Sequence, residues 1–145
     1  MVKVASESVH VRHRIHGRQR GSAVVELAIL APLLFLVTIG AFELGRGMWV
    51  KHTLSHVASE AARYAAVRSV TSDDPATESK VATRVKSQAV GINPDDLVVQ
   101  TTWTPGNTVG GTVQVRVSYD FRPVTPLIPF KSLQLASAST TTIAY

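Results

Sequence analysis

The chain has 145 residues, a length that suits one small domain with appendages. It contains no cysteine, which excludes disulfides, thiol nucleophiles and zinc–thiolate sites. Its formal net charge of +5 is concentrated at the N-terminus, where residues 1–21 carry five basic side chains and one acidic one, so that residues 22–145 hold a net charge of only +1. Binding to a phosphate backbone needs cations spread over a folded face, so this distribution excludes a nucleic-acid partner.

A basic leader precedes a long apolar segment. Residues 1–20 are polar, rich in Arg and His and without helical or strand periodicity, so no regular structure is expected there. From Ser22 to Phe42 the only charged residue is Glu26. A helix of this length spans about 31 Å, close to the ~30 Å hydrocarbon core of a bilayer. Secretory signals have apolar cores of only about 7–15 residues, and a buried core helix needs more surrounding chain, so we predict a membrane span.

The flanking charges predict how the span is oriented. Arg18 and Arg20 lie directly before it, and short cationic flanks stay in the cytoplasm. Arg46 and Lys51 follow it closely and weaken the asymmetry without reversing it. We therefore expect a cytoplasmic leader at 1–21, a transmembrane helix at 22–42 and a domain outside the cytoplasmic membrane at 43–145.

The helix is expected to continue beyond the membrane to Val70, because no proline interrupts it. One apolar stripe recurs at helical spacing and comprises Val50, Leu54, Val57, Ala61 and Tyr64. A second helix is predicted after it, capped by Asp74 with Pro75 in its first turn and ended by Gly91 and Pro94. Its buried face would be Val81, Ala82, Val85 and Ala89.

Three strands are expected to follow, at 97–104, 112–121 and 133–144. In the second, apolar and polar residues alternate, which is typical of a half-buried antiparallel strand; its apolar side is Val113, Val115, Val117, Tyr119 and Phe121. In the third, the apolar side would be Leu133, Leu135 and Ile143. The proline-rich segment 123–130 between them is expected to be a loop. The predicted fold class is α+β, a long N-terminal helix and a short second helix covering a small three-stranded antiparallel sheet.

The most specific stretch lies where the leader meets the span. Gly21 separates the basic cluster from the apolar helix, and Glu26 lies five residues after it. The glycine leaves the peptide bond to Ser22 sterically open at the expected start of a helix, where the backbone could be extended. A carboxylate within an apolar span is costly, by about 2.5–3.5 kcal/mol at the bilayer centre and less near its edge.

This pattern resembles the class III signal of prepilins and pseudopilins. The wider run from Arg18 to Val70, with Pro32, the Glu-Leu-Gly-Arg exit from the span and the Ala-rich helix, resembles the TadE-like family of tight-adherence (Flp-type) pilus assembly proteins. The resemblance implies cleavage between Gly21 and Ser22 by a prepilin peptidase, after which Glu26 would pair with a freed α-amino group. The major pilins of the family have Tyr after this Glu, whereas this chain has Leu27, and the departure fits a minor pseudopilin better than a filament-forming pilin.

More than one interpretation of the residues in this segment remains open. Gly21 and Glu26 could instead belong to an uncut signal anchor with Glu26 at the interface. Pro32 could set a bend for filament packing or be a tolerated membrane proline, and Ala41 and Gly45, four residues apart, could permit close helix association.

Other candidate sites are weaker. His52, His56 and Glu60 form a row at helical spacing, which we interpret as a solvated face rather than a metal site. The acidic pairs at 73–74 and 95–96 suit caps and turns rather than calcium. No nucleophile or acid–base pair is visible, so we expect neither an enzyme nor a cofactor nor a small-molecule substrate.

The sequence thus favours a non-catalytic, pilin-like component of pilus or secretion machinery. Its expected partners are membrane lipid, a prepilin peptidase, and other pilin or pseudopilin subunits and assembly proteins. The alternative is an unprocessed, membrane-tethered binding or envelope protein.

Overall fold

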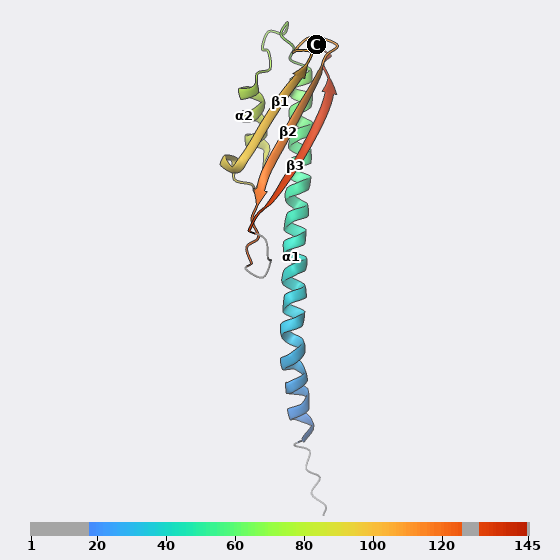
Figure 1. Cartoon of the computed structure of the whole chain (residues 1–145), viewed down its shortest axis with the longest axis vertical. Helices are drawn as coiled ribbons and strands as arrows, with labels where there is room; N and C mark the ends of the chain where they lie inside the picture. Colours follow the sequence, from blue (N-terminus) through green and yellow to red (C-terminus); the bar gives the residue numbers. More distant parts are fainter. Residues whose placement is uncertain (1–17, 126–130, 145) are drawn as a thin grey trace, which may run out of the picture. The chain divides into compact units, whose positions relative to one another are not determined.

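The computed structural model describes residues 18–125 and 131–144, with side chains from residue 21 onward. The chain divides into two units, one up to Thr38 and one from Ile39. Residues 1–17 of the predicted unstructured leader lie outside the described residues, as does the second part of the proline-rich loop, 126–130. The α+β fold class is confirmed: two α-helices and a three-stranded antiparallel sheet (Figure 1).

Helix α1 runs from Arg18 to Ala66 and so belongs to both units. It begins three residues before the glycine at which a helix start was predicted, so Gly21 lies inside the helix and the predicted start is too late. It also ends four residues before Val70. The second unit explains this end, because the amide of Arg68 turns back to the carbonyl of Ala65, and the amide of Ala144 donates to the carbonyl of Ala66.

Helix α2 runs from Glu78 to Gln88 and is capped by Thr77, whose hydroxyl accepts a hydrogen bond from the amide of Lys80. The predicted cap, Asp74, is instead paired with Lys80 and Arg68, so the helix begins three residues after Pro75. Val81 and Val85 are buried as predicted, with Ala89 at the C-cap, whereas Ala82 is only half-buried. A short 3₁₀ helix, η1 (Pro94–Asp96), leads into the sheet.

The strands are β1 (Leu97–Thr104), β2 (Thr112–Phe121) and β3 (Leu133–Thr142), in the order β1-β2-β3 and all antiparallel. The first two have the predicted bounds, and β3 ends two residues earlier than predicted. In the register, Val117 lies opposite Val99 on one side and Ser137 on the other. The predicted apolar side of β2 is buried, with Tyr119 half-buried. Of the predicted side of β3, Ile143 is buried just past the strand, but Leu133 is exposed.

The core of the second unit lies between the sheet and the helices. Helix α1 contributes a face that begins at Val50 and Leu54 and continues as a row of alanines; its buried members are Val50, Leu54, Val57, Ala58, Ala61, Ala62, Ala65 and Ala66. The sheet contributes Val113, Val115 and Val117. Small side chains on the helix allow its backbone to come close to the sheet, which is how a sheet of three strands gains the cover it needs.

Candidate functional site

The apolar half of α1 exposes nearly all of its surface. Every side chain from Gly21 to Thr38 is exposed except that of Ala31, which is half-buried, and the large aliphatic and aromatic side chains between Val24 and Val37 are 51–70% exposed. The most apolar 18-residue window of this helix has a mean hydropathy of 2.4 and none of it is buried. The chain therefore has one apolar N-terminal helix compatible with single-pass anchoring in a membrane.

The residues predicted for processing lie on this exposed half. Gly21, Ser22 and Glu26 are all helical and exposed. An added Cβ at Gly21 would have no atom within 4 Å, so nothing in its own unit shields that position. The bond after Gly21 lies close to the N-terminal end of α1, and helix ends fray easily.

The apolar segment contains one backbone carbonyl without its usual partner and one hydroxyl that is satisfied within the helix. Pro32 lies inside α1 and leaves the carbonyl of Ala28 without its usual amide partner. Thr38 donates its hydroxyl to the carbonyl of Leu34 over 2.8 Å. Exposed carbonyls of this kind favour contacts with neighbouring helices over contact with lipid alone.

Ala41 and Gly45, the residues predicted to permit close helix association, lie on one side of the helix. With Phe42, Arg46 and Trp49 they line a shallow hollow of about 490 Å³. No atom lies within 4 Å of a Cβ built on Gly45. Gly45 therefore makes no side-chain contact that its small size would explain within the second unit.

An ion pair at the start of the second unit was not anticipated. Glu43 is 4% exposed and accepts hydrogen bonds from Arg46 Nη2 at 2.8 Å and from the amide of Val124 at 2.9 Å. Arg46 Nη2 also donates to the carbonyl of Arg122 at 2.6 Å, and its guanidinium lies 4.1 Å from the ring centroid of Phe121. This cluster of Glu43, Arg46 and Phe121, here called the Glu43 anchor, fastens the chain after β2 to α1.

The charge state of the Glu43 anchor follows from its contacts. Burial opposes ionisation of Glu43 and acts to raise its pKa. The opposing effects are stronger: the hydrogen bond and positive charge of Arg46, and the backbone amides of Val124 and Thr125. Together they lower the pKa of the carboxyl below its ordinary value. Glu43 is therefore an anion at neutral pH and a permanent partner of Arg46.

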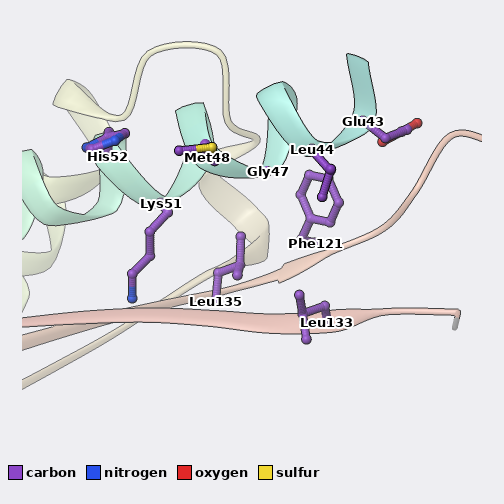
Figure 2. A pocket seen from close by; sticks show the side chains of 9 residues that line it. All are labelled: Glu43, Leu44, Gly47, Met48, Lys51, His52, Phe121, Leu133 and Leu135. Atoms are coloured by element: carbon purple, nitrogen blue, oxygen red, sulfur yellow. The ribbon is translucent and has the colours of Figure 1, made fainter. Parts of the chain in front are cut away.

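Beside the Glu43 anchor lies an apolar groove of about 350 Å³ (Figure 2). Helix α1 supplies Leu44, Gly47 and Met48, and the sheet supplies Phe121, Leu133 and Leu135. Glu43, Lys51 and His52 lie at its margin. Leu44 and Met48 are 72% and 63% exposed, so the groove is open.

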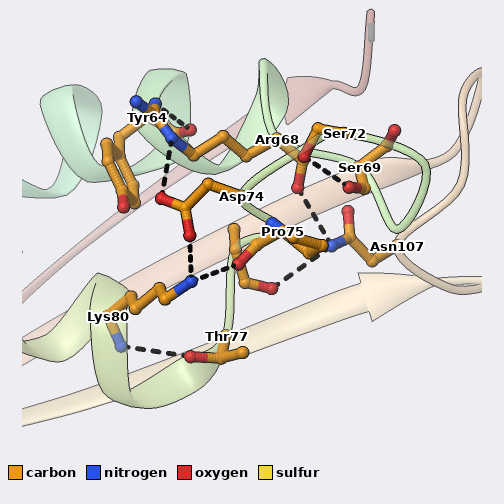
Figure 3. A network of polar contacts seen from close by, with 10 residues as sticks. Tyr64, Arg68, Ser69, Ser72, Asp74, Pro75, Thr77, Lys80 and Asn107 are labelled. Atoms are coloured by element: carbon orange, nitrogen blue, oxygen red, sulfur yellow. Dashed lines mark hydrogen bonds and ion pairs between the residues drawn. The ribbon is translucent and has the colours of Figure 1, made fainter.

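A second cluster lies where α1 ends (Figure 3). Asp74 pairs with Lys80, and more loosely with Arg68 at 3.9 Å. The hydrogen bond from Lys80 and its charge, aided by Arg68, lower the pKa of Asp74 against a small opposing effect of burial. Asn107 joins the same region by donating its side-chain amide to the carbonyls of Arg68 and Ala76 at 3.1 and 3.3 Å.

The row of His52, His56 and Glu60 and the tryptophan at position 49 are further features of the second unit's part of α1. His52, His56 and Glu60 form no metal cluster, and no group of three or more potential metal ligands occurs within residues 18–125 and 131–144. Trp49 is 47% exposed and packs over Gly91.

Sequence reasoning missed the Glu43 anchor and the groove for one reason. Glu43 and Arg46 are visible as an acid and a base three apart directly after an apolar run, a pattern that suggests an ion pair. Their further partners, the carbonyl of Arg122 and the amide of Val124, lie almost eighty residues later. Nothing local in the sequence connects them.

One comparison with known proteins finds a similarity in the N-terminal part of the chain. The family model described as TadE-like protein matches residues 21–63, which confirms the resemblance seen in the sequence. The match covers the apolar half of α1, the Glu43 anchor's two helical residues and most of the alanine row. No curated protein and no solved structure matches the chain.

Proposed function

Proceeding from this TadE-like segment, we propose that the chain is a minor pilin or pseudopilin-like component of a tight-adherence (Flp/type IVb) pilus assembly or secretion system. The TadE-like match supports an association with such a pilus system and with its assembly components. The observation that carries the proposal is the exposed apolar half of α1, joined to a separately packed unit. In such a chain the apolar half of α1 contacts lipid and neighbouring helices, and the second unit makes contacts outside the membrane.

In this proposal the protein is made with a cytoplasmic leader and anchored in the cytoplasmic membrane with its second unit outside. A prepilin peptidase cuts between Gly21 and Ser22, and Glu26 then pairs with a freed α-amino group of its own or of a neighbouring subunit. The open position of Gly21 and the exposed carboxylate of Glu26 support this step.

Assembly then proceeds through the helix without catalysis. Ala41 and Gly45 allow a neighbouring helix to approach, and Pro32 leaves a carbonyl for it to meet. The second unit offers its outer surface to other subunits.

The mature N-terminus tests the processing step. Mass spectrometry of the membrane-purified protein should find Ser22 as the first residue in cells with an active prepilin peptidase, and Met1 in cells without it. Gly21→Val should block the cut, because a β-branched side chain crowds the bond, whereas Gly17→Val, in the leader, should leave it intact. An intact leader on the wild-type chain in peptidase-positive cells would remove the processing claim.

Cross-linking separates assembly from the alternative, an unprocessed tethered binding or envelope protein. A single cysteine at Ala28, on the exposed apolar half of α1, should give adducts with pilus components under piliated conditions. Thr102→Cys, exposed on β1, is the matched control. Absence of any adduct at residue 28 would favour the tether.

A further inference from the structure

The apolar groove lies where the second unit meets the end of the apolar segment. Within this unit, Ile39 and Phe42 complete the apolar run, and Phe42 is 75% exposed. Leu44 and Met48 follow on the same helix, about 3 and 9 Å further along its axis at 1.5 Å per residue. The interfacial layer of a bilayer is about 5–8 Å thick on each side of the hydrocarbon core, so a chain leaving the core near Phe42 places Leu44 within the headgroup layer and Met48 at its outer edge.

The groove has the chemistry of a lipid site. Its walls are aliphatic and aromatic, contributed by Leu44, Met48, Phe121, Leu133 and Leu135. Exposed apolar surface of this kind costs free energy in water, at about 25 cal/mol per Å², and the cost is removed when an acyl chain covers it.

The margin of the groove is cationic. Lys51 lies about one helical turn further from the span than Met48, on the water side of the headgroup layer, from which a long lysine side chain can reach back to an anionic headgroup. The acid at the opposite margin, Glu43, is already neutralised by Arg46. Lys51 donates to the carbonyl of Ala136, and among the described residues it has no acidic partner, so its charge is uncompensated.

We propose that this groove binds a phospholipid of the membrane that holds α1, with an acyl chain along Met48 and Leu133 and an anionic headgroup at Lys51. The proposal rests on the membrane anchoring in the proposed function and adds to it a defined lipid contact of the second unit. Continuity with the exposed apolar segment and the cationic margin favour lipid over a second copy of the chain. Lipid bound there would hold the second unit against the membrane surface before assembly.

Because the chain has no cysteine, single-cysteine variants can carry a fluorescent label without further changes. Leu133→Cys reports the groove. Leu34→Cys reports the apolar half of α1. Val90→Cys is the matched control. Val90 is exposed and adjoins Gly91, which packs on Trp49, the residue next to Met48 on α1. The control therefore lies beside the same stretch of α1 but outside the groove.

Each full-length variant, labelled with bimane, is reconstituted into vesicles of phosphatidylcholine and phosphatidylglycerol with and without bromine on the acyl chains. We expect brominated lipid to quench emission at residues 34 and 133 and to leave residue 90 unquenched. Equal quenching at 133 and 90, or none at 133 with residue 34 quenched, would overturn the lipid site while leaving the anchoring intact. No quenching at residue 34 would overturn the anchoring itself.

Two further measurements distinguish lipid from a second copy of the chain in the groove and test the headgroup contact. If a second copy fills the groove, Met48→Cys forms disulfide-linked dimers and residue 133 is shielded from brominated lipid, which overturns the proposal. If lipid fills it, residue 133 is quenched more by brominated phosphatidylglycerol than by brominated phosphatidylcholine. Lys51→Gln should abolish this preference and Lys86→Gln, on α2, should keep it; an unchanged preference in the Lys51 variant would refute the headgroup contact.

Discussion

The two halves of α1 use the same backbone for opposite purposes. From Gly21 to Thr38 the helix turns large aliphatic side chains outward on all sides, and almost nothing in its own unit covers them. From Val50 to Ala66 its buried face is made largely of alanine and valine and lies under the sheet. A helix that is apolar all round belongs in lipid, whereas a helix with one apolar stripe belongs against a domain. The exposure of the large side chains therefore distinguishes the half of α1 that suits lipid from the half that packs against the sheet.

The largest expected effect separates the halves by stability. Leu54 is fully buried, so Leu54→Ala should lower the free energy of unfolding of the second unit by about 2–5 kcal/mol. Leu36→Ala, the same change at a 56% exposed position, should lower it by far less. Urea unfolding in detergent, followed by tryptophan fluorescence, measures both. Similar losses for the two variants would mean that the units do not differ as described.

The converse experiment uses membrane retention. Leu34→Lys places a charge near the middle of the apolar segment, at a cost of about 2.5–3.5 kcal/mol, which is roughly a hundredfold in insertion. The variant should shift from the membrane fraction toward the soluble or degraded fraction. Thr102→Lys, on the exposed side of the sheet, should not. Full retention of the Leu34 variant after alkaline washing would contradict a lipid-facing role.

A pair of glycines gives a smaller contrast. Gly91 has φ +74°, and a Cβ there would come within 2.3 Å of the Trp49 ring, so Gly91→Ala should destabilise the second unit by about 1–3 kcal/mol. Gly45→Ala meets nothing within 4 Å and lies in a helix, so it should be neutral or stabilising by up to about 1 kcal/mol. Thermal unfolding of both variants measures the difference, and a harmless Gly91→Ala would show that the Trp49 contact does not constrain this turn.

The smallest effect is pH dependence. The folded pKa of Glu43 lies below its ordinary value of 4.5, and that of Asp74 below 3.8. Both carboxylates therefore contribute stability that is fully present above these ordinary values and is lost as the pH falls through the folded pKa values. Urea midpoints of the wild-type second unit should decline below about pH 4.5, and Glu43→Gln should decline less while starting lower. Equal slopes for both proteins would exclude Glu43 as a source of the decline.

Much of the fold was visible in the sequence because its signals are local. The alternation from Val113 to Phe121 fixed both the bounds and the buried side of β2. The ends of the helices were less visible. No glycine or proline stops α1 at Ala66; the stop comes from Ala144, nearly eighty residues later, and from Asn107, which bonds to the carbonyl of Arg68.

The missed cap of α2 has a similar cause. Asp74 before Pro75 has the pattern of a helix start, but its carboxylate is taken by Lys80 and Arg68. Thr77, a weaker signal, becomes the cap instead. The candidate site shows the same division: Gly21, Glu26, Ala41 and Gly45 could be named from spacing, but the groove could not, because its two walls come from distant parts of the chain.

The alanine row of α1 also limits how this protein can diverge. Ala58, Ala61, Ala62 and Ala65 have no exposed surface against the sheet, so even one added methylene at these positions forces the layers apart. The outer side of the sheet carries no such constraint. Substitutions on that outer side can therefore change what the sheet contacts without disturbing the packing between α1 and the sheet.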